Sequence, residues 1–211
     1  MRELKIKVCG MRSVANRQAL EELPVDLLGF IFYPPSPRSV TTLPAAEAKK
    51  LLDTAKARVG VFVNENPFKI LKQAQVLRLT HVQLHGEETP ETCRLIRQNR
   101  LQVIKVFRVD DSFDFSLTEK YAGAADFFLF DTKAEQPGGT GRQFNWQILE
   151  NYRLAVPFFL SGGITPADAE NIRQMVHPAF YGIDLNSGFE EEPGVKNFEK
   201  LKSFIDQLKN E

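Results

Sequence analysis

The sequence contains only two cysteines, Cys9 and Cys93, in 211 residues. Neither belongs to a Cys-x-x-Cys pair or to a spacing with histidine, so the sequence carries no zinc-binding or redox motif. Cysteines that are not arranged as a disulfide framework are typical of a reducing compartment. We therefore expect a reduced, intracellular protein without a bound metal.

The sequence also lacks a net charge. Lysine and arginine together number 27, and aspartate and glutamate together number 27 as well. A protein without net charge has no long-range field that attracts nucleic acid or an anionic membrane. We expect neither of these partners, so any anionic ligand has to be bound by local groups.

Long apolar runs do not occur. Charged residues interrupt the N-terminal stretch at Arg2, Glu3, Lys5 and Lys7, which leaves no apolar core of the roughly 7–15 residues found in a signal peptide. No later run approaches the ~18 apolar residues that cross a bilayer. The sequence predicts a cytoplasmic location.

The sequence does contain short apolar runs that alternate with segments of helical periodicity. Apolar, β-branched or aromatic residues form eight candidate strands, at 4–9, 27–33, 59–63, 81–85, 102–107, 126–131, 158–161 and 179–185. Candidate helices lie between or after them, at 14–23, 45–57, 67–77, 90–99, 166–175 and 198–208. The connection after Phe107 and the stretch 134–144 are less well defined.

Strands that alternate with helices favour right-handed βαβ units and a parallel sheet, and eight such units close a barrel. We predict a protein of the α/β class with a TIM (β/α)8 barrel fold. A barrel of this length is commonly a single domain, so we expect one catalytic domain over residues 1–211. An open, doubly wound sheet is the alternative.

Two of the predicted strands end in reactive side chains. The first ends at Cys9, before Gly10, and the sixth ends at Asp131. In a barrel of parallel strands the carboxyl ends meet at one face, where catalytic groups lie. We interpret Cys9 as a base, whose thiolate Lys7 or Arg38 would favour, and Asp131 as an acid. A buried structural cysteine and an aspartate that caps a turn are the alternatives.

The seventh and eighth predicted strands are followed by loops of small residues. The first loop begins Ser161-Gly162-Gly163, and the second contains Asn186 and Ser187. In barrels of this type, the loops after strands seven and eight present backbone N–H groups to a phosphate. We expect these five residues to bind phosphate; a tight turn at the two glycines is the alternative.

Three more polar residues are candidates for the site. Arg38 follows the second strand in the proline-rich loop 33–39, and a stiff loop helps a guanidinium bind a carboxylate or phosphate bidentately. Gln83 and His85 alternate along the fourth strand, so both can line the barrel mouth. We expect His85 to form hydrogen bonds rather than to bind a metal, and a solvated surface arginine is the alternative for Arg38.

Glycines are concentrated in the segment 134–142, which follows the predicted acid and contains Gly138-Gly139-Thr140-Gly141. This composition is typical of a mobile cover that excludes water from a reactive intermediate. A surface loop without that role explains the composition equally well.

With these motifs assembled, the chain resembles the phosphoribosylanthranilate isomerases of tryptophan biosynthesis. The resemblance spans the whole chain, and Lys-x-Cys-Gly combined with Phe-Asp-Thr is its most specific part. The segments that carry it are Lys7–Met11, Gly29–Phe32 with Ser36-Pro37-Arg38, Val59–Asn64, Val82–Gly86, Phe130-Asp131-Thr132, Gly138–Gly141, Leu160–Ile164 and Gly182–Gly188.

The resemblance implies an Amadori rearrangement, in which the aldose N-(5-phosphoribosyl)anthranilate becomes the ketose 1-(2-carboxyphenylamino)-1-deoxyribulose 5-phosphate without a cofactor. It implies that Asp131 protonates the ring oxygen of the ribose and that the Cys9 thiolate removes the proton from C2. It further implies that Arg38 binds the anthranilate carboxylate and that Asp184 contacts the substrate.

Two alternatives remain beside this resemblance. An isomerase of the histidine pathway uses aspartates as both acid and base, so Cys9 argues against it. A non-catalytic barrel that binds phosphate ligands would have no use for Cys9 together with Asp131. The segment 107–125 carries no mark of the family, and small barrels of this kind occur as monomers and as homodimers.

Overall fold

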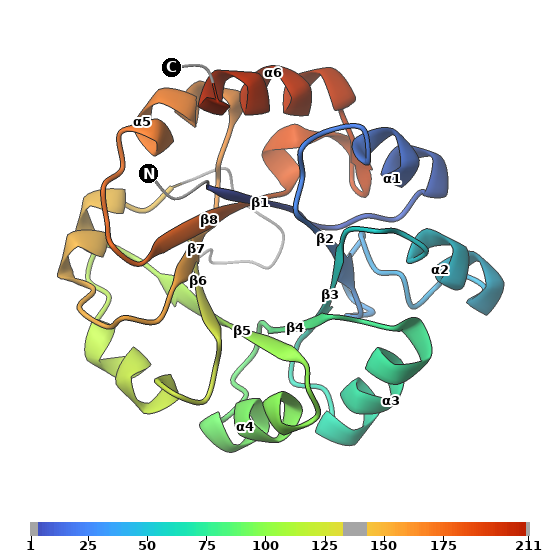
Figure 1. Cartoon of the computed structure of the whole chain (residues 1–211), viewed down its shortest axis with the longest axis horizontal. Helices are drawn as coiled ribbons and strands as arrows, with labels where there is room; N and C mark the ends of the chain where they lie inside the picture. The colour runs from blue at the N-terminus through green and yellow to red at the C-terminus, as the bar shows by residue number, and fades with distance from the viewer. Residues whose placement is uncertain (1–3, 133–142, 210–211) are drawn as a thin grey trace.

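The computed structural model describes residues 4–132 and 143–209. In this part of the chain, eight parallel strands close into a barrel in which β8 pairs with β1 (Figure 1). The predicted fold class is confirmed, and every predicted strand is present. The segment 134–142, interpreted as a cover, lies outside the described residues. The strands are β1 (Lys5–Val8), β2 (Leu27–Ile31), β3 (Ala57–Phe62), β4 (His81–Leu84), β5 (Gln102–Val109), β6 (Phe127–Thr132), β7 (Phe158–Leu160) and β8 (Phe180–Leu185).

Helices surround the barrel (Figure 1), and side-chain caps explain where several of them begin. Asn66 accepts hydrogen bonds from the backbone N–H groups of Phe68 and Lys69, and Thr89 accepts one from Thr92. A proline follows each cap, at a helical position where its missing N–H costs nothing. The α-helices are α1 (Val14–Leu20), α2 (Ala45–Leu51), α3 (Pro67–Leu77), α4 (Pro90–Gln98), α5 (Ala169–Arg173), which the 3-10 turn η3 (Pro166–Asp168) precedes, and α6 (Phe198–Lys209).

The helix predicted over 45–57 is wrong in its second half. It ends at Leu51, and β3 already begins at Ala57. Thr54 stands in the connection, where its hydroxyl accepts a hydrogen bond from the Lys56 N–H and its carbonyl accepts one from Arg58. Local bonds of this kind compete with helical hydrogen bonds, which is the physical reason for the early stop.

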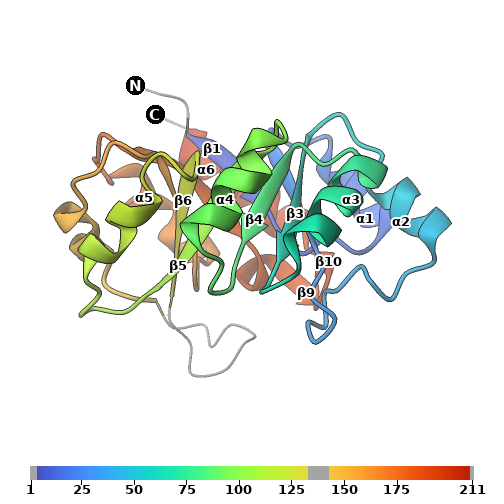
Figure 2. The same cartoon turned by 90° about the horizontal axis from the view of Figure 1, so that it is seen from below.

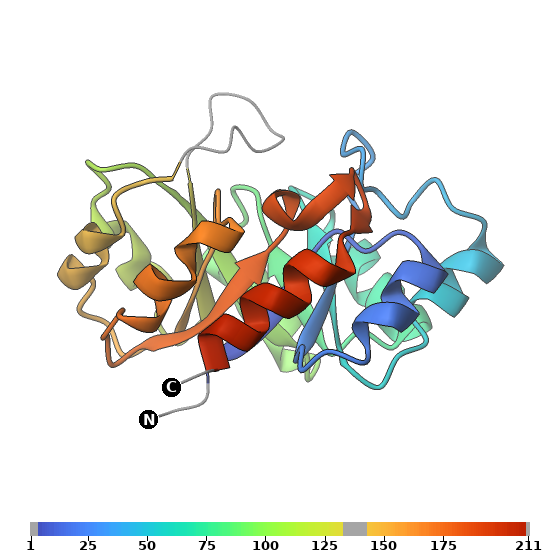
Figure 3. The ribbon, with the colours of Figure 1, turned by 90° about the horizontal axis from the view of Figure 1, so that it is seen from above.

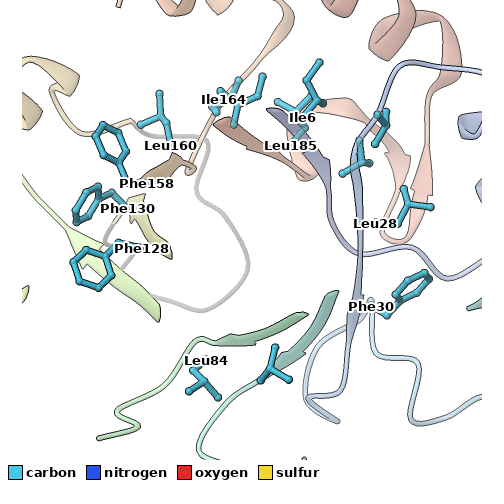
Figure 4. Packing of buried hydrophobic residues seen from close by; sticks show 14 of the residues in the cluster. Ile6, Leu28, Phe30, Leu84, Phe128, Phe130, Phe158, Leu160, Ile164 and Leu185 are labelled. Atoms are coloured by element: carbon cyan, nitrogen blue, oxygen red, sulfur yellow. The ribbon is translucent and has the colours of Figure 1, made fainter. Parts of the chain in front are cut away.

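The two connections that the sequence defines poorly contain short 3-10 helices. Helix η1 (Phe115–Tyr121) follows β5, and η2 (Trp146–Asn151) precedes β7. Aromatic rings provide much of the packing here. The ring centroid of Phe130 lies 5.2 Å from that of Tyr152 and 5.2 Å from that of Phe158. Figure 4 shows Phe130 and Phe158 side by side on the outer face of their strands. Each such aromatic pair contributes about 0.5–1.5 kcal/mol beyond its buried area.

The interior of the barrel is apolar in its deeper part and charged toward the carboxyl ends of the strands. One core cluster fills the interior, and a larger one lies between strands and helices (Figure 4). Lys7 on β1 and Asp184 on β8 face each other in the strand register. The residues of the interior cluster are Leu27, Val59, Ile104, Val106, Phe127, Leu129 and Phe159.

The carboxyl ends of the parallel strands meet at one face of the molecule, and the chain termini lie at the opposite face. A hairpin of β9 (Glu190–Glu192) and β10 (Val195–Lys196) follows β8 and lies at the carboxyl-end face (Figures 2 and 3). Among the described residues, no helix is both long and apolar enough to cross a membrane.

Candidate active site

Cys9 directly follows β1 at the carboxyl-end face of the barrel. Its backbone N–H donates a 2.9 Å hydrogen bond to the carbonyl oxygen of Leu185 at the end of β8. The residue is only 4% exposed. Gly29 on β2 makes room for the thiol, because a Cβ atom at this position would lie 2.7 Å from the sulfur. The thiol therefore lies against the bare backbone of β2, at the face where the sequence predicts it.

A buried ion pair lies next to the thiol. Lys7 Nζ donates a 2.7 Å hydrogen bond to Asp184 Oδ1, and both side chains are buried. Burial lowers the pKa of Lys7, but the attraction of Asp184 and Cys9 outweighs it and raises the pKa above its ordinary value. Burial also raises the pKa of the Asp184 carboxyl, and Lys7 opposes that rise. Lys7 therefore keeps its positive charge inside the barrel.

The thiol itself is harder to ionise than an exposed one. Burial raises the pKa of Cys9, while the nearby Lys7 and Lys196 lower it and the negative charge of Asp184 raises it further. The attraction by Lys7 that the sequence predicts is present, but desolvation of the thiolate is the larger effect, so the pKa of the thiol is raised overall. Ionisation of this thiol is favoured by the cations that surround it.

Asp131 lies near the end of β6 and is held by the side chain of His85, which directly follows β4. His85 Nε2 lies 3.2 Å from Asp131 Oδ2, and Gln83 Nε2 lies 3.4 Å from His85 Nδ1. Gln83 and His85 share one face, as predicted. Gln83, however, is 1% exposed and lies inside the barrel rather than at its mouth, because it is two residues deeper along β4 than His85. Within residues 4–132 and 143–209, no group of three or more His, Cys, Asp or Glu side chains is arranged to hold a metal ion.

Arg38 is bound by the β9–β10 hairpin and is 8% exposed, so the alternative of a solvated surface arginine is wrong. Its Nε and Nη2 donate to both carboxylate oxygens of Glu190 at 2.6–3.0 Å. Lys196 Nζ donates to the same carboxylate at 2.6 Å and to Asn186 Oδ1 at 2.7 Å. Gly10 leaves room for both cations, because its Cβ would lie 2.9 Å from Arg38 Cδ and 3.5 Å from Lys196 Nζ.

The end of β6 and the loops after β7 and β8 touch one another. A Cβ atom at Gly162 would collide with the backbone N–H and hydroxyl of Thr132, and one at Gly188 would collide with the carbonyl oxygen of Ile164. Gly162 and Gly163 have φ angles of +89° and +70°, which side chains disfavour. Among the described residues, no acceptor takes up the N–H groups of either glycine, of Asn186 or of Ser187. These N–H groups are therefore available to an anion.

Residues 6–207 match the family model described as N-(5'-phosphoribosyl)anthranilate isomerase. The match covers nearly the whole chain. The chain belongs to this family. As an isomerase of tryptophan biosynthesis, it converts N-(5'-phosphoribosyl)anthranilate into 1-(2-carboxyphenylamino)-1-deoxyribulose 5-phosphate. The histidine-pathway isomerase and the non-catalytic barrel are thereby set aside.

Relatives and solved structures agree with this assignment. The isomerase of Parabacteroides distasonis is 45% identical over 204 residues, which cover 96% of this chain and 92% of the relative. That of Phocaeicola vulgatus is 46% identical over 204 residues, with 97% of both chains covered. The crystal structure of the Thermotoga maritima isomerase superimposes with a TM-score of 0.84 at 34% identity, covering 98% of this chain and 99% of that one.

Sequence reasoning missed Glu190 and Lys196 of this isomerase. Both belong to the hairpin, whose Pro193-Gly194 turn brings them together across five intervening residues. The only signal in the sequence is a glutamate and a lysine on either side of a Pro-Gly pair, a pattern typical of turns in general. The contact of Glu190 with Arg38 joins segments that lie 152 residues apart.

Proposed function

We propose that Cys9 is the general base and Asp131 the general acid of the isomerisation. The observation that carries the proposal is the placement of the two side chains at the carboxyl ends of β1 and β6, around one shared interior. The carboxyl group of Asp184 interacts electrostatically with Asp131 and His85 as well as with Lys7. The two sides of the barrel mouth therefore belong to a single site.

The reaction needs the two groups in opposite protonation states. Asp131 donates a proton to the ring oxygen of the ribose, which opens the ring to an iminium ion. Cys9, as a thiolate, then removes the proton at C2, and the resulting enolamine tautomerises to the ketone. No covalent bond to sulfur forms. His85, 3.2 Å from the carboxyl group, orients Asp131 toward the substrate.

Substrate binding divides between the two sides of the same face. Arg38 binds the carboxylate of the anthranilate, while Gln83, His85 and Asp184 contact the sugar or support groups that do. The sugar phosphate lies on Ser161 and on the N–H groups of Gly162, Gly163, Asn186 and Ser187. The placement of the phosphate is supported by the N–H groups of these loops, for which the described residues provide no hydrogen-bond acceptor. A related isomerase has been solved in complex with reduced 1-(o-carboxyphenylamino)-1-deoxyribulose 5-phosphate. That structure is 33% identical to this chain and superimposes on it with a TM-score of 0.82.

The experiment is a turnover assay with Cys9→Ser and Asp131→Asn. The readout is the fall in fluorescence of N-(5'-phosphoribosyl)anthranilate that is generated in the cuvette. We expect turnover to fall by roughly 10²-fold or more in each variant, the scale of lost general acid–base catalysis, while the affinity for the reduced product analogue stays near that of the parent.

Two variants serve as matched controls. Cys93→Ala changes the second cysteine of the chain, which lies in α4, and Asp206→Asn changes an aspartate on the exposed face of α6. Both should turn over substrate at the parental rate. Near-parental turnover in Cys9→Ser or Asp131→Asn would remove that residue from its assigned role without affecting the family assignment.

We further propose that the isomerase works in the cytoplasm as a monomer or homodimer. Cys9 and Cys93 are both free thiols, and a cysteine base requires a reducing environment. Cys9, Asp131, Arg38 and the phosphate loops all come from one chain, so the proposed site is complete within it. One crystal structure is of mutually generated monomers of the dimeric Thermotoga maritima isomerase.

A further inference from the structure

Lys7 is a fully buried lysine to which the proposed reaction steps assign no task. A buried ammonium needs a partner, and Asp184 provides one at 2.7 Å. A buried ion pair on its own is weak evidence for stability, because well-packed apolar residues often serve as well. The position of the pair is more informative. Lys7 on β1 lies two residues before Cys9, which directly follows the strand, so the alternation of the strand points both side chains to the same side.

The surroundings of Cys9 can be followed element by element. On β1 the charged group is Lys7, on β8 it is Asp184, and on β10 it is Lys196. Neighbouring β2 presents Gly29, which has no side chain. Among the described residues, the charged groups with the largest effect on the thiol are therefore two cations and one anion, and the anion is the partner of Lys7.

The second cation is largely committed elsewhere. Lys196 Nζ donates to the carboxylate of Glu190 at 2.6 Å, and that carboxylate also accepts three hydrogen bonds from Arg38. Among the described residues, the only carboxylate paired with Lys7 is that of Asp184. Lys7 is also the cation with the larger attraction for the thiolate. A neutral group at Lys7 would leave the Asp184 carboxylate facing the thiolate inside a dry barrel, where like charges repel strongly.

We propose that Lys7 is a positioning residue of the isomerase, whose buried ammonium stabilises the thiolate of Cys9 while Asp184 holds that ammonium in place and opposes the thiolate. The inference deepens the proposed function, because it rests on Cys9 acting as the base. Lys7 acts through Cys9, by setting how readily the thiol loses its proton.

The test measures the thiolate directly, without turnover. The rate at which iodoacetamide alkylates Cys9 is followed against pH, with the Cys9 peptide resolved by mass, because only the thiolate reacts. Cys93 does not interfere, since burial raises its pKa to about 11 and its side chain is enclosed. Lys7→Met alone leaves a bare carboxylate that can unfold the barrel. The informative pair is therefore Asp184→Asn and the double variant Lys7→Met/Asp184→Asn, each checked for native circular dichroism.

The two variants should shift in opposite directions. Asp184→Asn removes the repelling anion and lowers the midpoint pH of alkylation by about one unit or more, which is at least about tenfold faster reaction at neutral pH. The double variant also lacks the cation of Lys7, so its midpoint pH should be higher than that of Asp184→Asn by about one unit or more. Lys5→Met is the matched control, because Lys5 is an ion-paired lysine of the same strand that binds Asp26 instead. Its midpoint should equal the parental one.

The proposal is overturned if the double variant has the same midpoint as Asp184→Asn, since Lys7 would then be only the structural partner of the aspartate. It is also overturned if Asp184→Asn raises the midpoint. Failure of the proposed function looks different: normal turnover in Cys9→Ser would show that Cys9 is not the base, whatever the midpoints of the Lys7 and Asp184 variants.

Discussion

At the scale of single residues, the guanidinium of Arg38 is held on one side only. Its Nε and Nη2 bind the carboxylate of Glu190, while Nη1 has no hydrogen bond to any residue the structure describes. A bidentate, charge-assisted pair fixes the plane of the guanidinium. One edge of the arginine is therefore held by the hairpin, and the other can bind a carboxylate without first being ordered.

This division predicts how Arg38→Ala changes ligand affinity. The variant should weaken binding of reduced 1-(o-carboxyphenylamino)-1-deoxyribulose 5-phosphate by about 10- to 100-fold, the scale of a lost hydrogen bond to a charged group. The loss should be much smaller for the analogue that lacks the carboxylate. Paired calorimetric titrations measure both, with Arg94→Ala on the exposed face of α4 as control. Equal losses for the two ligands would contradict the assigned contact.

At the scale of an element, the turn after β7 is built around glycine for two separate reasons. Gly162 has a φ of +89°, and its α-carbon also lies so close to Thr132 that no side chain fits. The structure offers a position where only the first reason applies. Gly123 has a φ of +76°, and a Cβ atom there would meet nothing within 4 Å.

Gly162→Ala and Gly123→Ala therefore form a matched pair. Gly123→Ala should lower the free energy of unfolding by about 1 kcal/mol, the cost of a left-handed backbone with a side chain, and leave turnover unchanged. Gly162→Ala should lower it further and should also weaken inhibition by inorganic phosphate, because Thr132 and the loop have to move apart. Urea denaturation and phosphate inhibition measure the two effects. Parental phosphate inhibition in Gly162→Ala would place the phosphate elsewhere.

At the scale of the whole molecule, the stability of the barrel depends on a histidine far from the proposed chemistry. His81 begins β4, and its Nδ1 lies 2.8 Å from the Thr80 hydroxyl. Burial lowers its pKa from 6.5 to about 4, against the attraction of Asp126. The unfolded chain takes up this proton near pH 6.5, but the folded protein does so only near pH 4. The free energy of unfolding therefore falls as the pH drops through this window.

The contribution of His81 can be isolated by comparison with His81→Gln. Between pH 7 and pH 4, the parent should lose about 2 kcal/mol more of its free energy of unfolding than the variant does, because glutamine takes up no proton. Urea unfolding at a series of pH values measures the difference. Parallel stability curves for the two proteins would show that the imidazole titrates alike in the folded and unfolded chains.

Much of the barrel and of the site could be predicted because the responsible signals are local. The eight apolar runs became the eight strands, and the capping residues Asn66 and Thr89 begin helices at the predicted positions. The placement of Cys9, of Asp131 and of the two loops proposed to bind phosphate at carboxyl ends of strands could be predicted, because strand ends can be recognised along the chain. The helix over 45–57 failed because hydrogen bonds of Thr54 interrupt it, and periodicity does not register such bonds.

The sequence by itself determined the order of elements, the face of the barrel that carries reactive side chains, and the family. The tertiary structure alone decided the charge partners: Asp184 for Lys7, Glu190 for Arg38, and His85 for Asp131. The physical reason is that strand register and burial are properties of the closed barrel. They decide that desolvation outweighs attraction at the Cys9 thiol, and a linear sequence contains neither the distances nor the exclusion of water on which that balance depends.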